Sequence, residues 1–215
     1  MKTIFFDVDG LLIDSEKVYF RCWKMALNKL NLSMTDDEIL ELRSLDSRLA
    51  NAYFLNHFND DSVYGKVRTL RKELMSEEIN KQPLAVKPGV KELISYLKTN
   101  NIDYGIVTSS PQKRAMEYMR SVGLDGYFET IISTERVEKG KPYPDVYMYA
   151  CKVAGRTPQE CIAVEDSPNG LKSAHDAGLK TIMIPDLTPY SQKMSEYVDW
   201  CFEKLDDIIS SDVIY

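Results

Sequence analysis

The spacing of hydrophobic and polar residues differs between three successive regions of this chain. A short apolar run at residues 4–6 predicts a buried strand of a parallel sheet, because strands covered on both faces are apolar throughout. Between residues 15 and 81 the apolar side chains recur at helical spacing, as Phe20, Trp23 and Leu27 do, with no convincing strand. In the remainder of the chain, strand-like runs alternate with helical stripes. The pattern therefore predicts an all-helical segment placed inside an α/β protein.

Four further strands are predicted in the last region, at residues 104–107, 130–132, 161–164 and 181–184. The helices are led by prolines, which favour the first turn of a helix, at Pro88, Pro111, Pro144 and Pro168. Repeated β-α-β units give a parallel sheet with helices on both faces and right-handed crossovers. We expect an α/β, doubly wound parallel-sheet (Rossmann-like) core formed by residues 1–14 and 82–215, with residues 15–81 as an inserted α-helical domain. The tail from Trp200 predicts a closing strand and helix.

Composition narrows the class of protein. The chain has 215 residues, 44% of them apolar, which is ordinary for a globular protein with a sizeable core. A net charge of −6 argues against general affinity for nucleic acid or anionic membranes. The apolar runs are far too short to span a bilayer, and no separate signal segment precedes the first strand. The four cysteines lie far apart without a zinc-site pattern. We therefore expect a cytoplasmic protein with reduced thiols.

The strongest chemical signal follows the first strand. Asp7 and Asp9 are separated by one residue, and Gly10 then lets the backbone turn sharply. In an extended strand, residues two apart point the same way, so both carboxylates would face one site unless the chain bends there. Adjacent carboxylates are costly unless a cation or a shared proton compensates them. The pair suggests a Mg²⁺ site in which one aspartate is also a nucleophile, although an Asp pair capping a turn would look the same.

Polar clusters also follow three later strands. Thr108 and Ser109 precede a helix, which suits a phosphate oxygen but also an ordinary helix cap. Lys141 stands in a loop stiffened by glycine and prolines, and could neutralise a phosphate or crowded carboxylates, although a solvated lysine is the simpler alternative. Glu165 and Asp166 form a second acidic pair, which could complete a hard-cation site.

Taken in order, these motifs resemble those of the haloacid dehalogenase (HAD) superfamily of phosphohydrolases. The match consists of DxDG at residues 7–10, Thr108 or Ser109, Lys141 and the Glu165-Asp166 pair. The helical insert corresponds to the small α-helical cap of that superfamily, and the rest to the HAD core. Residues 14–16 (Asp-Ser-Glu), together with the GKPxPD and EDSxxG patterns, look most like the β-phosphoglucomutase-like subgroup.

The resemblance implies a role for each matched residue. Asp7 would attack phosphorus to form an aspartyl-phosphate, and Asp9 would be the general acid and base. Mg²⁺ would be held by Asp7, the backbone carbonyl of Asp9, Asp166 and, directly or through water, Glu165. Lys141 would offset charge between the nucleophile and the phosphate. The phosphate-binding residues would be Asp7, Gly10, Thr108, Ser109 and Lys141.

The cap region gives weaker signals. Its polar candidates for substrate contact are Tyr19, Arg21, Lys24, Arg43 and Arg48. A solvated helix face is the favoured interpretation for any single one of them. β-Phosphoglucomutases have a histidine in the segment aligning with Tyr19 and a Gly-x-Ser-Arg stretch that residues 43–48 fit poorly. Both departures favour a phosphatase.

Three functions remain open. The first is a Mg²⁺-dependent phosphatase of small phosphomonoesters, in particular sugar phosphates. The second is a β-phosphoglucomutase-type isomerase that returns the phosphate to a sugar instead of water. The third, a non-catalytic phosphate-binding protein, is disfavoured because every position needed for chemistry holds a competent residue. We expect a monomer whose partner is a small phosphorylated metabolite, with no nucleic acid or membrane partner.

Overall fold

A six-stranded parallel sheet forms the centre of the protein. The computed structural model describes residues 2–214. The strands are β1 (Thr3–Phe6), β2 (Tyr104–Thr108), β3 (Ile131–Ser133), β4 (Cys161–Glu165), β5 (Lys180–Met183) and β6 (Trp200–Cys201). Their order in the sheet is β3-β2-β1-β4-β5-β6, and every pair is parallel. The predicted doubly wound α/β fold is confirmed, and β6 is the closing strand expected near the C-terminus.

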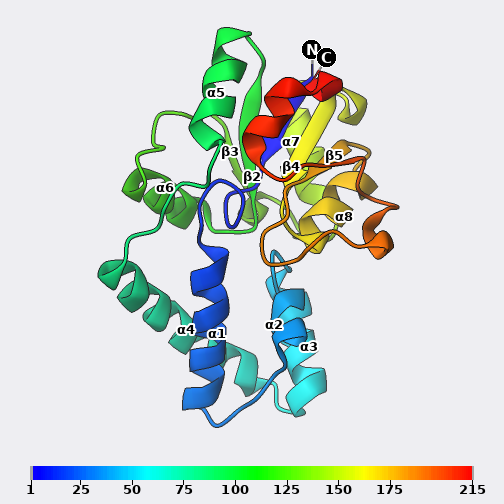
Figure 1. The fold of residues 1–215 in the computed structure, drawn as a ribbon. Coiled ribbons are helices and arrows are strands. Elements are labelled where there is room, and N and C mark those ends of the chain that lie inside the picture. Colours follow the sequence, from blue (N-terminus) through cyan, green and yellow to red (C-terminus); the bar gives the residue numbers. More distant parts are fainter. Residues whose placement is uncertain (1, 215) are drawn as a thin grey trace.

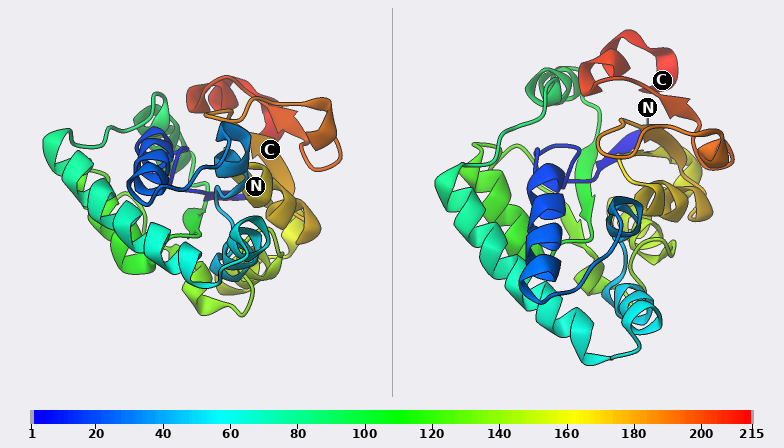
Figure 2. Two further views of the ribbon diagram at one scale, coloured as in Figure 1. Left: turned by 90° about the horizontal axis from the view of Figure 1, so that it is seen from below. Right: turned by 60° about the horizontal axis from the view of Figure 1, so that its bottom comes forward.

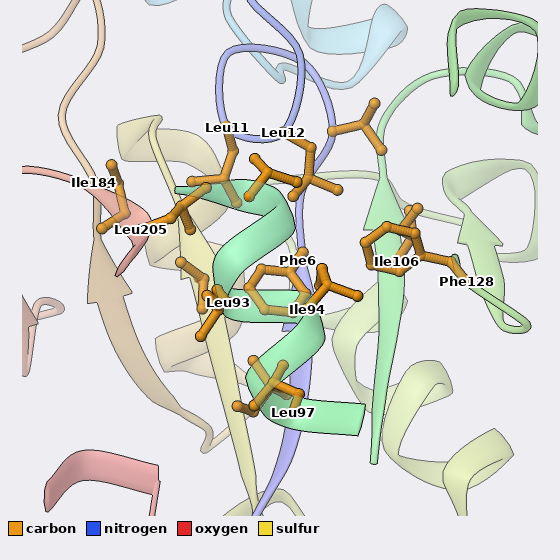
Figure 3. Close-up of a cluster of buried hydrophobic side chains, with 14 of the residues drawn as sticks. Phe6, Leu11, Leu12, Leu93, Ile94, Leu97, Ile106, Phe128, Ile184 and Leu205 are labelled. Atoms are coloured by element: carbon orange, nitrogen blue, oxygen red, sulfur yellow. The ribbon is translucent and has the colours of Figure 1, made fainter. Parts of the chain in front are cut away.

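Helices cover both faces of the sheet because side chains alternate along each strand. Ile4 and Phe6 face the cluster that holds α5 (Val90–Thr99), α6 (Gln112–Ser121) and the 3₁₀ helix η4 (Leu205–Ser210). Figure 3 shows Leu93, Ile94 and Leu97 of α5 lying over Phe6 in this cluster.

Phe5 faces the opposite side, where α7 (Asp145–Ala154) and α8 (Pro168–Asp176) supply the packing. Three of the four prolines stand within one residue of a helix start, as the sequence predicts: Pro111 and Pro144 are N-cap residues, and Pro168 opens α8. α5 begins two residues after Pro88 instead, because Gly89 takes a left-handed conformation (φ 82°) as its N-cap.

Four consecutive helices form the insert. They are α1 (Glu16–Lys29), α2 (Asp36–Glu41), α3 (Ser47–Phe58) and α4 (Ser62–Lys81). They pack around an apolar cluster of their own that includes Leu27, Phe54 and Leu74. Figure 1 and the right-hand view of Figure 2 show them at the end of the molecule opposite the two chain termini. This separate cluster supports the division that we propose, with residues 1–14 and 82–215 as the core domain and 15–81 as the cap.

The chain leaves the core and re-enters it at the same place. The backbone N–H of Asp14 donates to the Ala85 carbonyl (2.9 Å), and that of Lys87 donates to the Leu12 carbonyl (3.0 Å). Two adjacent backbone segments, at residues 12–14 and 85–87, therefore join the cap to the core.

Among residues 2–214, none of the helices has the length and apolarity needed to cross a bilayer.

Candidate functional site

The carboxyl ends of three neighbouring strands bring the sequence motifs together. Asp7 directly follows β1, Thr108 is the last residue of β2, and Glu165 is the last residue of β4. These strands are adjacent in the order β2-β1-β4. Open α/β sheets bind ligands at this edge, and the cap helices lie over it (Figure 1).

Lys141 occupies the centre of the site although it comes from a distant loop, between β3 and α7. Its ammonium Nζ lies 2.6 Å from Asp7 Oδ1, 2.6 Å from Glu165 Oε1 and 3.0 Å from the Val107 carbonyl. The side chain is fully buried. Tyr147, which the sequence pattern did not single out, donates its hydroxyl to Glu165 Oε1 at 2.5 Å. One buried cation thus fixes the carboxylates from two strands.

Three buried carboxylates face one another beside Lys141. Oxygen atoms of Asp7, Glu165 and Asp166 all lie within 4.8 Å of one another. Asp7 Oδ2, Glu165 Oε2 and Asp166 Oδ1 are buried without any hydrogen-bond partner among the described residues. Burying an unpaired carboxylate oxygen is costly, and Mg²⁺ prefers oxygen ligands. The donor set therefore fits a hard divalent cation.

The charges of the site also favour the binding of a cation. Burial raises the pKa of Asp7 to about 7, although Lys141 opposes the shift, and the Glu165 and Asp9 carboxylates add to it. Burial also raises the pKa of Asp166 well above its usual range. For Lys141, burial alone would lower the pKa, but Asp7 and Glu165 raise it above the ordinary lysine value. The pocket is short of positive charge unless a cation or protons are added.

Asp9 has a different environment from Asp7. β1 ends at Phe6, so the strand rule for residues two apart does not apply, and Gly10 turns the chain with φ 86°. The Asp9 carboxylate accepts hydrogen bonds from Ser15 Oγ (2.7 Å) and Ser110 Oγ (2.5 Å). It lies outside the three-carboxylate group, so its backbone carbonyl is the part left for the metal role that the resemblance implies.

The sequence did not predict that Ser15 or Ser110 contacts Asp9. Gly10 also allows a close approach, since a Cβ at this position would collide with Asp166 Oδ2. Thr108 Oγ1 accepts from the Ser110 backbone N–H (3.0 Å), and Ser109 Oγ donates to the Ser44 carbonyl of the cap (3.0 Å).

The expectation that each cap cation lies on a solvated helix face is wrong for Arg43. Its side chain is only 5% exposed. Nε donates to Glu16 Oε2 (3.2 Å), Nη1 donates to Thr188 Oγ1 (3.0 Å), and Nη2 contacts Asp166 Oδ2. Asp166 needs a positive partner because it is buried, and the loop after α2 supplies one. The cap is thereby connected to the acidic pair of the core.

A cavity of about 430 Å³ lies between the cap and the core and includes Asp7, Asp9, Thr108 and Ser109 in its lining. Tyr19 and Arg48 also line it, and Tyr19 is buried rather than solvated.

Arg21 and Lys24 do not line this cavity. They lie in exposed ion pairs with Glu78 (4.0 Å) and Asp36 (2.6 Å). Three arginines of the lining were not recognised from the sequence: Arg68, Arg71 and Arg114. Single arginines on helical stripes carry no local pattern, so only the fold could bring them together.

Comparisons with known proteins agree with this geometry. A family model described as haloacid dehalogenase-like hydrolase matches residues 4–184. The chain is 26% identical over 183 residues to the phosphorylated carbohydrates phosphatase of Thermotoga maritima, covering 85% of this chain and 84% of that protein. It is also 26% identical over 189 residues to the beta-phosphoglucomutase of Bacillus subtilis, covering 83% and 81% respectively.

Among solved structures, a hydrolase from Pseudomonas syringae superposes with a TM-score of 0.84 at 22% identity, covering 98% of this chain and 97% of that chain. This likeness shows the shared fold. The family match runs from β1 to the residue after β5 and so includes all four motifs. The chain therefore belongs to the haloacid dehalogenase-like hydrolases, an enzyme family, and resembles their β-phosphoglucomutase-like members.

Proposed function

We propose that this protein is a Mg²⁺-dependent phosphatase of small phosphomonoesters, in particular sugar phosphates, which acts through an aspartyl-phosphate on Asp7. The observation that carries the proposal is the Asp7 carboxylate. One of its oxygens is fixed by Lys141, and the other is buried without a partner beside Glu165 and Asp166. A nucleophile that must approach an anionic phosphate needs such compensation.

The residues divide the reaction into two displacements. In the first, a carboxylate oxygen of Asp7 forms a bond to phosphorus, the bond to the leaving oxygen breaks, and Asp9 gives that oxygen a proton. In the second, Asp9 takes a proton from water, which attacks phosphorus and releases phosphate and free Asp7. General acid–base catalysis of this kind contributes on the order of 10²–10⁴-fold. Ser15 and Ser110 hold the Asp9 carboxylate in place for both steps.

Residues at the same edge of the sheet would bind both the metal and the phosphate. Asp7, Asp166, the backbone carbonyl of Asp9 and Glu165 would hold Mg²⁺, which when bound offsets the negative charge of the phosphoryl group. Thr108 and Ser109 line the cavity next to Asp7 and are the proposed donors to the phosphoryl oxygens, with Lys141 as the balancing cation.

A β-phosphoglucomutase-type isomerase is the second candidate. The cavity is lined by Arg68, Arg71 and Arg114, and a mutase needs cations that hold a second phosphate. Tyr19 and residues 43–48 still depart from the mutase pattern, which favours water as the phosphoryl acceptor. For either activity, we propose a cytoplasmic monomer whose partner is a small phosphorylated metabolite.

Substitution of the nucleophile tests the proposal. Asp7→Asn is nearly isosteric, and Asp125→Asn changes an exposed aspartate far from the motifs as a matched control. We expect Asp7→Asn to lower phosphate release from sugar phosphates by at least about a thousandfold, as loss of a nucleophile does elsewhere. Acid-quenched wild-type protein should carry the added mass of one phosphoryl group, and the variant should not. Full activity in Asp7→Asn would contradict the nucleophile assignment.

A further inference from the structure

Arg71 is a buried cation without an anionic partner. It lies on α4, is 6% exposed and lines the cavity between cap and core. Its guanidinium lies 4.8 Å from the ring centroids of both Tyr19 and Trp23. Buried arginines are normally paired with carboxylates. Among residues 2–214, however, Arg71 makes no ion pair, and its Nε has no hydrogen-bond partner.

Arg114 approaches the same aromatic ring from the core domain. It lies on α6, which runs beside α4 in both views of Figure 2, and its guanidinium is 5.7 Å from the Tyr19 ring centroid. Nη2 donates to Ser110 Oγ at 2.8 Å, while Nε has no partner among the described residues. Ser110 in turn donates to Asp9. Arg114 is therefore two hydrogen bonds away from the proposed general acid.

These cations repel one another. Burial lowers the pKa of Arg71, and the positive charges of Arg114 and Arg68 lower it further. Arg68 lies one turn before Arg71 on α4 and also lines the cavity. Arg71 is buried, whereas Arg68 and Arg114 are partly buried. Such a cluster of like charges is unfavourable unless an anion joins it. Two of the acidic side chains lining the cavity are already used: Glu16 pairs with Arg43, and Asp46 pairs with Arg48.

We infer that Arg71 and Arg114, supported by Arg68, form a subsite for a second anionic group of the substrate. That group is a carboxylate or a second phosphate, held beyond Asp9 while the transferred phosphoryl group lies at Asp7. Guanidinium groups bind both oxyanions through paired N–H donors. The volume of about 430 Å³ is within the range of small-molecule sites and suits a compact metabolite with an anion at each end. The inference rests on the proposed function for the position of the first phosphate.

Direct binding tests the subsite without requiring turnover. Calorimetry with Asp7→Asn protein in MgCl₂ would compare two pairs of probes: fructose 1,6-bisphosphate with fructose 6-phosphate, and 2-phosphoglycolate with ethyl phosphate. We expect the probe with the second anion to bind about tenfold to a hundredfold more tightly, because hydrogen bonds between charged groups are stronger than those between neutral groups. The pair that shows the preference identifies the anion as phosphate or carboxylate.

Variants assign the preference to the arginines. Adding Arg71→Met or, separately, Arg114→Met should remove most of it while leaving the affinity for fructose 6-phosphate and ethyl phosphate within about twofold. Arg71→Lys should restore part of it. Arg21→Met, at an exposed arginine of α1 outside the cavity, is the matched control and should bind all four probes as the parent does.

Equal affinity within both probe pairs, or an equal loss for all four probes in both arginine variants, would overturn the subsite. Phosphate release by the wild-type protein, measured with the same probes, separates this outcome from failure of the proposed function. Wild-type protein that releases phosphate from fructose 6-phosphate or ethyl phosphate, without any preference for either probe that carries a second anion, would keep the phosphatase and reject the subsite. Protein that binds the second anion but releases no phosphate from any probe would keep the subsite and reject the phosphatase.

Discussion

At the scale of single residues, the carboxylates of Asp7 and Asp9 differ in the side chains that surround them. Asp7 meets a lysine and two other acids, whereas Asp9 meets two serine hydroxyls. Two aspartates separated by one residue can therefore take different parts in one reaction. In the proposed mechanism, Asp7 forms and breaks the bond to phosphorus, and Asp9 moves the protons.

Ser110 should be needed mainly where Asp9 acts as an acid. Ser110→Ala removes the hydroxyl that holds the Asp9 carboxylate at 2.5 Å. We expect kcat on sugar phosphates to fall about tenfold, the value of one hydrogen bond of about 1–1.5 kcal/mol, with a smaller loss on 4-nitrophenyl phosphate. The nitrophenolate leaving group needs little protonation. Steady-state kinetics on both substrates is the measurement, and Ser121→Ala, at an exposed serine of α6, is the control. Equal losses on both substrates would speak against the positioning role.

The sequence predicted the four family motifs because each directly follows a strand or stands in a stiffened loop. It did not predict Ser110 in contact with Asp9, Tyr147 on Glu165 or Arg43 on Asp166. These contacts join residues that lie 18 to 123 positions apart. Serine, tyrosine and arginine on helices and loops carry no local sign of such partners, so their roles depend on the tertiary structure.

At the scale of elements, the join between β4 and α8 shows how tightly the acidic pair is fitted. Ser167 caps α8 by accepting from the Gly170 backbone N–H at 3.1 Å. Gly170 lies against the Glu165 carboxylate, and a Cβ there would collide with both carboxylate oxygens. A glycine in the first turn of α8 therefore lets the carboxylate lie between the helix and Lys141.

Gly170→Ala should displace Glu165 from Lys141 and Tyr147. We expect weaker Mg²⁺ binding and a loss of activity on the order of a hundredfold, the usual scale for misplacement by about 1 Å. Gly65→Ala is the matched control because no atom lies within 4 Å of a Cβ added there, near the start of α4. It should leave activity unchanged and stabilise the protein by up to about 1 kcal/mol. Mg²⁺ titration of both variants is the measurement, and unchanged Mg²⁺ affinity in Gly170→Ala would contradict this account of the fit.

Most elements could be predicted from the sequence alone, because the spacing of apolar residues and the length of each apolar segment distinguish buried strands from amphipathic helices. The predicted strand at 161–164 extends by one residue, to Glu165, and that at 181–184 begins at Lys180. What the pattern could not give is how the cap helices face the core. The amphipathic stripes of α1 and α4 specify packing inside the cap. Arg71 shares the buried face of α4 with Val67 and Leu74 and yet lines the cavity, which the spacing alone does not reveal.

At the scale of the whole molecule, two bodies are connected by a two-stranded hinge and by the contacts of Arg43. Arg43 belongs to the cap region, and its partner Asp166 belongs to the core. This ion pair is buried on both sides. Removing one member leaves an unpaired buried charge, so the contact should affect folding stability as well as the closure of the cap.

Arg43→Met should lower the free energy of unfolding by about 3 kcal/mol in the absence of Mg²⁺. Added Mg²⁺ should recover part of this loss, because the ion would compensate the buried Asp166 carboxylate that has lost its partner. Arg156→Met breaks an exposed ion pair with Asp103 (3.0 Å) and should cost much less, because solvent screens exposed ion pairs. Urea denaturation with EDTA or with MgCl₂ measures both. Similar losses for the two variants would contradict the role of Arg43.

The buried carboxylates also predict how stability depends on pH. In the folded protein, burial raises the pKa of Asp7 from 3.8 to about 7 and that of Glu16 from 4.5 to about 7. Between about pH 4 and pH 7 the folded state therefore keeps protons that the unfolded state has released. Stability without metal should fall as the pH rises through this window, and Mg²⁺ should reduce the fall by stabilising the ionised form of Asp7.

Thermal denaturation between about pH 4 and pH 8, with EDTA or with MgCl₂, checks this dependence. Asp7→Asn provides the comparison, because it removes one of the two carboxyl groups and should flatten part of the fall in EDTA. Stability that increases with pH across this range in EDTA would contradict the electrostatic description of the site.

The central claim is that water, and not a sugar, accepts the phosphoryl group from Asp7. The most direct measurement is ³¹P NMR of the wild-type protein with MgCl₂ and a panel of sugar phosphates, including β-glucose 1-phosphate with a trace of glucose 1,6-bisphosphate. We expect the signal of inorganic phosphate to grow, to require Mg²⁺ and to be absent with Asp7→Asn. Conversion of glucose 1-phosphate to glucose 6-phosphate without release of phosphate would contradict the claim and identify the protein as a mutase.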